Sequence, residues 1–216
     1  MESRDWWPIY RLRLTTPRLE LRIPTYDDLL ALGDLAAEGI HDPAVMPFSV
    51  PWSDWPPEAR ARSTVQIRLR LLGALTAESW QLPFVVVRDG TVVGGQDVGA
   101  DDFANLKQVT TGSWLGRRFQ GDRLGVEMRA AVLLFAFAGL GAEWATTAAF
   151  TDNAASNAIS RRLGYEPDGV DVVERRGEAA QSQRYRLGRD RWAEHATIAV
   201  EIHGLDDSVR ALLGAG

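Results

Sequence analysis

The chain has 216 residues, of which 45% are hydrophobic and 25% are charged, so it can bury one sizeable core as ordinary globular proteins do. A formal net charge of -5 argues against bulk electrostatic attraction to nucleic acid or to an anionic membrane. The sequence has no cysteine and three histidines, which excludes disulfides and a thiolate nucleophile and argues against a metal site.

The segment "MESRDWWPIY" lacks the apolar core of a signal peptide, and no later stretch reaches about 18 uninterrupted apolar residues. The chain also shows no low-complexity linker and no internal repeat. We therefore expect residues 1–216 to form a single cytoplasmic domain that does not enter a membrane.

The first predicted elements are a strand, a helix, a long loop and a second helix. Leu19, Leu21 and Ile23 alternate with charged residues, which is typical of a half-buried strand. Thr25 precedes "YDDLLALGDLAAEGI", where a hydroxyl cap and early carboxylates predict a helix. The aromatic and proline-rich segment 41–60 indicates a long loop, and Pro56 and Pro57 are typical of the start of a helix running to about Leu75.

The middle of the chain predicts a hairpin and a further strand. "FVVVRDGTVVGGQDV" has β-branched runs on both sides of Asp89-Gly90, a pair that readily supplies the positive φ angles of a tight turn. Residues 109–116, "VTTGSWLG", indicate the next strand, which we expect to be weakened or bulged at Gly112.

A glycine-containing turn, "FQGDRLG" at 119–125, opens into an apolar stretch with helical spacing. This helix is apolar on nearly every face, so we expect it to be buried, to end at Gly139 and Gly141, and to lead into a covered strand at 144–150. Unpaired amides and the positive end of the helix dipole favour phosphate at such a turn. The same residues are also consistent with a plain connecting turn that binds no ligand.

Asn153, Ser156, Asn157 and Ser160 recur at helical spacing in "TDNAASNAISRRLGYEPDG". Asp152 or Asn153 can cap this short helix, and Gly164 can end it. The uncharged stripe beside Ile159 and Leu163 fits a pocket wall that binds amide groups, and it equally fits a well-capped helix surface.

Taken in order, these segments resemble the GNAT superfamily of N-acyltransferases, and the resemblance covers most of the chain. The similarity lies in "LTTPRLELRIPTYDDL", "GSWLGRRFQG", "DNAASNAISRRLGY" and "VVERRGEAAQSQRYRL", and it is strongest with the branch of ribosomal-protein N-terminal acetyltransferases. It implies an α/β fold whose mixed, mostly antiparallel sheet has a V-shaped splay and is flanked by helices.

The resemblance also implies acetyl-CoA, or another acyl-CoA, as cofactor. The family turn holds the pyrophosphate on backbone amides; Gln120 and Gly125 match its first and last positions, but Arg123 replaces its middle glycine. Asn153 matches a residue that contacts pantetheine. The implied cofactor-binding residues are Trp114, Gly116, Arg117, Arg118, Gln120, Gly121, Asp122, Arg123, Leu124, Gly125, Asn153 and Ser156.

For catalysis, the resemblance implies that the Leu115 N–H stabilises the oxyanion and that Ser160 protonates the leaving thiolate. An acyl thioester is already activated, so the remaining needs are alignment of the amine and removal of its proton. The acidic residue that this branch often places before "GSWL" is absent, because Thr110 and Thr111 stand there. His41, Asp97, Asp101 and Asp102 stay open as candidate bases.

The acceptor side is predicted in the aromatic loop, where Phe48, Trp52 and Trp55 can form rigid walls or can simply pack over the sheet. The expected acceptor is a primary amine of a small molecule or a protein N-terminus, and a homodimer is an expected assembly. Two alternatives stay open: a donor such as aminoacyl-tRNA or a carrier-protein thioester, read by Arg117, Arg118, Arg123, Arg161 and Arg162, and a non-catalytic acyl-CoA sensor.

Overall fold

The structure, a computed structural model, describes residues 6–216; residues 1–5 of the N-terminal segment lie outside the described residues. Within it, nine strands form one sheet in the order β7-β8-β6-β5-β4-β3-β2-β1-β9. The pair β5 and β6 is parallel and the other described pairs are antiparallel, as the fold-class prediction requires. The interpretation of residues 1–216 as one domain stays a prediction.

The strands are β1 (Arg13–Thr15), β2 (Glu20–Arg22), β3 (Ser79–Arg88), β4 (Thr91–Asp101), β5 (Gln108–Leu115), β6 (Trp144–Phe150), β7 (Glu166–Arg175), β8 (Glu178–Gly188) and β9 (Glu201–His203). The α-helices are α1 (Tyr26–Glu38), α2 (Pro57–Gly73), α3 (Phe103–Leu106), α4 (Leu124–Leu134), α5 (Ala154–Arg162), α6 (Arg189–His195) and α7 (Asp207–Leu212). Short 3-10 segments are η1 (Pro8–Arg11), η2 (Trp52–Asp54) and η3 (Arg117–Phe119), and η4 (Phe135–Leu140) is a π-helical continuation of α4.

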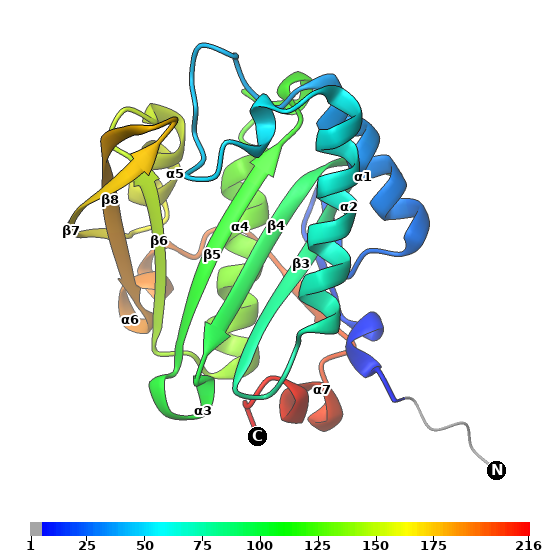
Figure 1. The fold of residues 1–216 in the computed structure, drawn as a ribbon. Coiled ribbons are helices and arrows are strands. Elements are labelled where there is room, and N and C mark those ends of the chain that lie inside the picture. The colour runs from blue at the N-terminus through cyan, green and yellow to red at the C-terminus, as the bar shows by residue number, and fades with distance from the viewer. Residues whose placement is uncertain (1–5) are drawn as a thin grey trace.

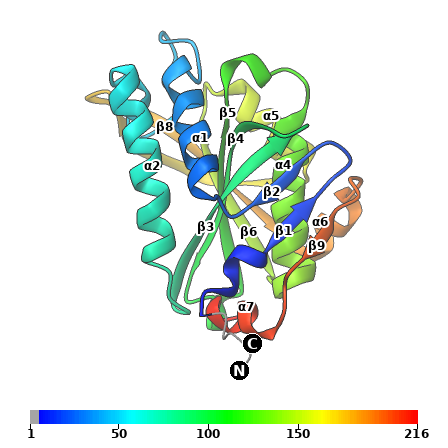
Figure 2. The same cartoon turned by 90° about the vertical axis from the view of Figure 1, so that its right-hand side faces the viewer.

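Helices cover both faces of the sheet. Figures 1 and 2 show α1 and α2 against one face and α4 against the other. The larger apolar cluster joins Phe135, which continues α4, to sheet residues beneath the helix such as Phe84 and Leu115. A smaller cluster on the other face joins Leu32 and Leu35 of α1 to Trp114 of β5. The fold therefore has three layers, with β5 between two separate cores.

The first helix begins where the sequence predicts. The Thr25 side chain accepts a hydrogen bond from the Asp28 N–H, and the Asp28 carboxylate accepts one from the Thr25 N–H, which completes a capping box. The helix ends before Gly39, whose φ of 113° is in the region that favours glycine. The second helix is also confirmed, running from Pro57 to Gly73 after Pro56.

The predicted hairpin is confirmed, with Asp89 and Gly90 at φ 48° and 76° between β3 and β4. The bulge expected at Gly112 is wrong, because β4 and β5 pair in unbroken register from Gly99↔Thr110 to Gly94↔Leu115. Gly112 lies opposite Asp97, and a Cβ built on Gly112 would meet nothing within 4 Å. This glycine leaves space beside the strand rather than bending it.

Two predictions around α4 need correction. The helix is buried as expected, but it does not end at Gly139, which lies within the π-helical turn; it stops at Gly141, whose φ is 78°. The strand β6 is not covered on both faces, since Trp144 and Ala148 are exposed while Ala145 and Ala149 are buried. The reason is that α1 and α2 lie over β3 and β4 and do not extend across β6 (Figure 1).

The C-terminal part of the chain forms a strand and a helix that the sequence analysis did not predict. Ile202 in β9 pairs with Leu14 in β1, and α7 follows with Asp206 as its cap. A three-residue strand is too short to show a hydrophobic period, so its pairing partner decides it.

Candidate active site

The strands β5 and β6 separate near their middles. Their parallel pairing covers Gln108–Thr110 against Trp144–Thr146 and then stops, although both strands continue to Leu115 and Phe150. Beyond it, the Thr147 hydroxyl still donates to the Thr111 carbonyl at 3.0 Å. Figure 1 shows the two strands diverging from this point. A V-shaped splay is therefore present, with one edge of β5 free of a neighbouring strand.

The Leu115 N–H faces this splay. On one side, the Gly116 N–H donates to the Val93 carbonyl, which precedes the part of β4 paired with β5, at 3.0 Å. On the other side, the carbonyls of Val109 and Thr111 accept from hydroxyls of β6. Backbone groups of successive residues in a strand point to opposite neighbours, so the odd-numbered residues of β5 point toward the splay. A donor there can bind a carbonyl oxygen placed between the strands.

The turn before α4 brings an uncapped helix end to the same region. Arg123 is the N-cap residue, and no side chain caps this end. The first helical hydrogen bonds come from the N–H groups of Val126 and Glu127, which leaves those of Leu124 and Gly125 for a ligand. Unpaired N–H groups at a helix start favour an anion.

Arg123 occupies the left-handed region with φ 59° and ψ 11°, so the backbone adopts here the conformation that glycine would adopt without cost. Its side chain is exposed and makes no ion pair with any residue in 6–216. Asp122 is held from the other side, since the Arg88 Nη1 donates to its carboxylate at 2.6 Å and the Arg18 Nη1 donates to its carbonyl at 3.1 Å. The turn is thus fixed through Asp122 while the Arg123 guanidinium stays free.

The remaining residues of the turn are tied to the neighbouring loop. Gln120 Nε2 donates to the carbonyls of Ile40 and Leu115 at 2.7 Å and 3.0 Å. Arg118 pairs with Glu38 at the end of α1, and Arg117 lies 3.9 Å from Asp42. Gly121 has φ 88° and is exposed.

The polar stripe of α5 is confirmed as one face of a helix, but its members differ in accessibility. Asn153 is half-buried, and its Oδ1 accepts from the Ser156 N–H at 3.1 Å as the helix cap. Asn157 is buried and fully engaged with backbone carbonyls and with the Tyr185 hydroxyl. Ser160 is completely buried, and its hydroxyl donates to the Ser156 carbonyl at 3.1 Å.

A buried arginine lies beside Ser160. Arg129 of α4 is 4% exposed; its Nη1 donates to the Ser160 Oγ at 3.0 Å and its Nη2 to the Ser113 Oγ of β5 at 3.3 Å. Burial lowers the pKa of Arg129, and burial raises the pKa of the nearby Tyr165 phenol. This face of the splay therefore carries a cation and two hydroxyls.

The opposite face of the splay meets the aromatic loop. The Phe48 and Trp52 rings lie 5.2 Å apart, and Trp52 contacts Trp114 edge-on at 5.9 Å. Trp55 is 43% exposed and makes none of these ring contacts. The structure thus brings Phe48 and Trp52 to β5 and leaves Trp55 outside the cluster.

The tip of the β7–β8 hairpin reaches the same loop. Arg176 Nε donates to Asp54 Oδ2 at 2.7 Å, and Arg176 Nη2 donates to the Pro43 carbonyl at 3.0 Å. The hydrogen bond from Arg176 holds the pKa of Asp54 below its usual value. This contact joins the two sides of the splay across its open end.

Among the candidate bases, Asp97 has the best position. It lies opposite Gly112, where space is open, on the face that carries Trp114. Its side chain is 21% exposed and pairs with Arg68 of α2, while burial raises the pKa of the Asp97 carboxyl.

The other three candidate bases lie in less favourable places. Asp101 lies seven residues beyond Gly94, the partner of Leu115, which is about 24 Å along a strand. Asp102 is one residue further, where it accepts a hydrogen bond from Asn105 at 2.8 Å. His41 is held inside the loop, with Nε2 2.6 Å from the Ser53 Oγ.

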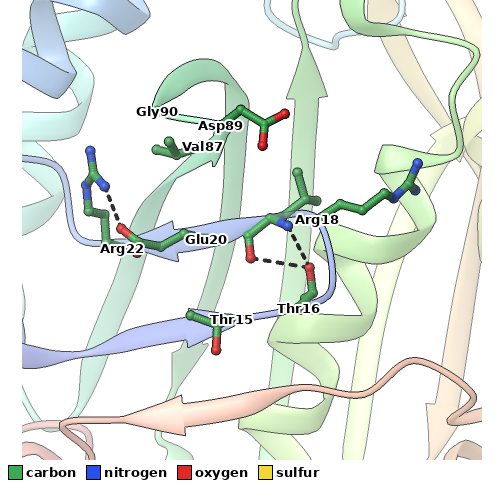
Figure 3. A pocket seen from close by; sticks show the side chains of 9 residues that line it. Thr15, Thr16, Arg18, Glu20, Arg22, Val87, Asp89 and Gly90 are labelled. Carbon is green, nitrogen blue, oxygen red and sulfur yellow. Dashed lines mark hydrogen bonds and ion pairs between the residues drawn. The ribbon is translucent and has the colours of Figure 1, made fainter.

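A surface hollow of about 300 Å³ lies elsewhere, between the β1–β2 hairpin and the end of β3 (Figure 3). Its charged groups are already paired: Arg22 with Glu20 inside the hollow, and Arg18 and Asp89 with Glu127 and Arg88 outside it. The convergent polar groups described above lie at the splay, so the splay is the candidate site. Within residues 6–216, no helix is long and apolar enough to cross a membrane, and no cluster of potential metal ligands is found.

Sequence reasoning missed Arg68, Arg129 and Arg176. Arg129 left a signal, because a charged residue within a helix that is apolar all round has to be buried. Arg68 and Arg176 stand in charged segments where no pattern separates a buried arginine from a solvated one.

Comparisons with known proteins agree with this geometry. Residues 18–166 match the family model described as "Acetyltransferase (GNAT) domain". Three solved structures share the fold at low identity. RimJ of Mycobacterium smegmatis, with a CoA disulfide, is 17% identical with a TM-score of 0.69, covering 88% of this chain and 92% of that one. RimL, a ribosomal L7/L12 alpha-N-protein acetyltransferase in complex with coenzyme A, is 20% identical with a TM-score of 0.64, covering 82% and 97%. A GNAT-family acetyltransferase from Bacillus anthracis is 16% identical with a TM-score of 0.66, covering 82% and 99%.

Proposed function

The chain belongs to the GNAT acetyltransferase family, and we propose that it transfers an acyl group from acyl-CoA to the primary amine of a protein N-terminus or a small molecule. The family assignment makes it an acetyltransferase. The observation that carries the proposal is the splay between β5 and β6, which exposes the Leu115 N–H beside the uncapped start of α4. Acetyl-CoA is the proposed donor, and the cytoplasm the proposed location.

The cofactor would lie along the splay. The N–H groups of Gly121 to Gly125 would bind the pyrophosphate, with Arg123 as a phosphate partner from the rim. The pantetheine amides would pair with the backbone groups of Ser113 and Leu115 on the free edge of β5, next to Trp114 and Gly116, whose backbone groups face β4. The Asn153 and Ser156 end of α5 would contact the same arm.

The acceptor amine would approach from the face that carries Trp52 and Trp114. Asp97, through a water molecule, would take its proton, because the open space at Gly112 lies directly beside that carboxylate. The nitrogen attacks the thioester carbon, and the Leu115 N–H stabilises the oxyanion that forms. A protein N-terminus is the preferred acceptor, since RimL, whose fold is shared, acts on a ribosomal protein.

The arginines give less support to the alternative donors, an aminoacyl-tRNA or a carrier-protein thioester. Arg117 and Arg118 are paired with Asp42 and Glu38, so a phosphate-reading surface would rest on Arg123, Arg161 and Arg162. An aminoacyl-tRNA donor would make activity fall steeply with salt.

The deciding experiment has two stages. Mass spectrometry of the purified protein would identify co-purified acyl-CoA. A panel of acyl-CoAs would then be tested against small amines and peptides with free N-termini, scored by release of free thiol. Thiol release with formation of an acylated amine is expected. Calorimetric binding of CoA without turnover would favour a sensor, and absence of both binding and turnover would overturn the proposal.

A further inference from the structure

Arg129 is a buried cation without a counter-ion. Its guanidinium contacts two neutral hydroxyls, on Ser113 and Ser160, and its Nε has no hydrogen-bond partner. Among residues 6–216, no carboxylate lies within 4 Å of it. A buried charge without an anion costs considerable free energy, so removing such a charge commonly does not destabilise a protein. An anion supplied by a ligand would account for its retention.

The position of Arg129 selects the kind of anion. Ser113 precedes Leu115 by two residues and lies on the same face of β5, so the guanidinium lies beneath the part of the splay that would hold the reacting thioester. Trp114 and Asp97 lie on the opposite face, from which the amine would approach. Charge that develops as the thioester breaks would therefore be next to Arg129.

We propose that Arg129 is a positioning residue that directs the Ser160 hydroxyl to the departing CoA sulfur and compensates the negative charge left on it. This inference rests on the proposed function. As the C–N bond forms and the C–S bond breaks, the C–S electron pair passes to sulfur. The Ser160 hydrogen turns from the Ser156 carbonyl to the sulfur, while Arg129 continues to donate to the Ser160 Oγ. The ammonium proton leaves on the opposite face, and the thiolate takes a proton from water after release.

The acidities of the two groups explain why a cation is needed. An ordinary thiol has a pKa of about 8.5, whereas an aliphatic hydroxyl resembles water and is a far weaker acid, with a much higher pKa. Ser160 therefore cannot give up its proton fully to a thiolate, and it acts as a hydrogen-bond donor. The thiolate must leave as an anion, which a nearby guanidinium stabilises.

The test compares CoA with desulfo-CoA, which lacks the thiol, by calorimetry at about pH 7 and about pH 9. The wild type is expected to favour CoA over desulfo-CoA by about 10-fold more at the higher pH, because the bound thiol ionises beside Arg129. Arg129→Met should lose this gain and bind desulfo-CoA as the wild type does. The other titratable groups near this face are Tyr165, whose raised pKa keeps it neutral, and Tyr185, which donates to Asn157.

Kinetics and stability separate this role from a structural one. Arg129→Met should lower kcat by about 100-fold while its melting temperature stays equal to or above that of the wild type. Arg129→Lys, which keeps the charge, should recover part of the pH-dependent preference for CoA. Arg62→Met is the matched control, because Arg62 is exposed on α2 and has no ion-pair partner among the described residues.

Three results would overturn the inference: an unchanged preference for CoA in Arg129→Met, an unchanged kcat, or a lowered melting temperature with equal losses for CoA and desulfo-CoA. Failure of the wild type to bind either compound would instead refute the proposed function.

Discussion

Replacing Arg123 with glycine tests how the turn binds phosphate. Arg123 has φ 59°, a conformation that costs a non-glycine residue about 1–2 kcal/mol. Glycine removes that strain but adds about 0.5–1 kcal/mol of chain entropy to the unfolded state. Arg123→Gly should therefore raise the free energy of unfolding by about 0 to 1.5 kcal/mol, which raises the melting temperature by about 0–6 °C in a chain of this size.

The same substitution has a bounded effect on CoA. The Arg123 guanidinium is exposed, so its contact with phosphate is worth at most about 1 kcal/mol, or about fivefold in Kd. The backbone amides that would bind the pyrophosphate are unchanged. Calorimetric titration should find that Arg123→Gly binds CoA with a Kd within about fivefold of the wild type, weaker or tighter.

Lys107→Gly is the matched control, because Lys107 has φ 48° just before β5, at the end of that strand opposite Leu115. It should show a similar change in stability and no change in CoA binding. The reasoning fails if the wild type binds CoA more weakly than millimolar and Arg123→Gly binds it at micromolar concentration. In that case Arg123 fills the phosphate site, and a different acyl donor becomes the better proposal.

Three further substitutions test separate steps. Asn153→Ala should mostly raise the KM for the acyl donor and lower the free energy of unfolding by about 1 kcal/mol, because α5 loses its cap. Ser160→Ala should mostly lower kcat, by roughly 10- to 1000-fold. Identical kinetics for the two variants would contradict the separate roles. Trp52→Ala should weaken acceptor binding and leave CoA affinity unchanged, and a lower melting temperature as its sole effect would make the contact with Trp114 purely structural. Burial raises the pKa of Asp97, so activity should fall as the pH decreases through that raised value. Asp97→Asn should lower kcat and remove this loss of activity at acidic pH. The same acidic loss in Asp97→Asn would exclude Asp97 as the base.

Local patterns in the sequence determine much of the architecture. Thr25 and Asp28 predict the start of α1, Asp89-Gly90 predicts the hairpin, and the spacing of Asn153, Ser156 and Ser160 predicts one face of α5. These predictions hold because caps, tight turns and helical periods depend on residues within a few positions of each other. The resemblance of the motifs to one family supplied the fold and the order of the site residues.

The tertiary structure decides what depends on long-range packing. The register of β5 against β4 shows that Gly112 leaves space beside Asp97 instead of forming a bulge. Arg129 and Ser160 are 31 positions apart in the chain, and their contact exists because α4 and α5 pack around Gly125, where a Cβ would lie 2.8 Å from Ile159. Burying a charged side chain such as that of Arg129 costs free energy, so a buried charge points to a specific role. How deeply a side chain is buried depends on the packing of distant elements, and a local sequence pattern does not give it.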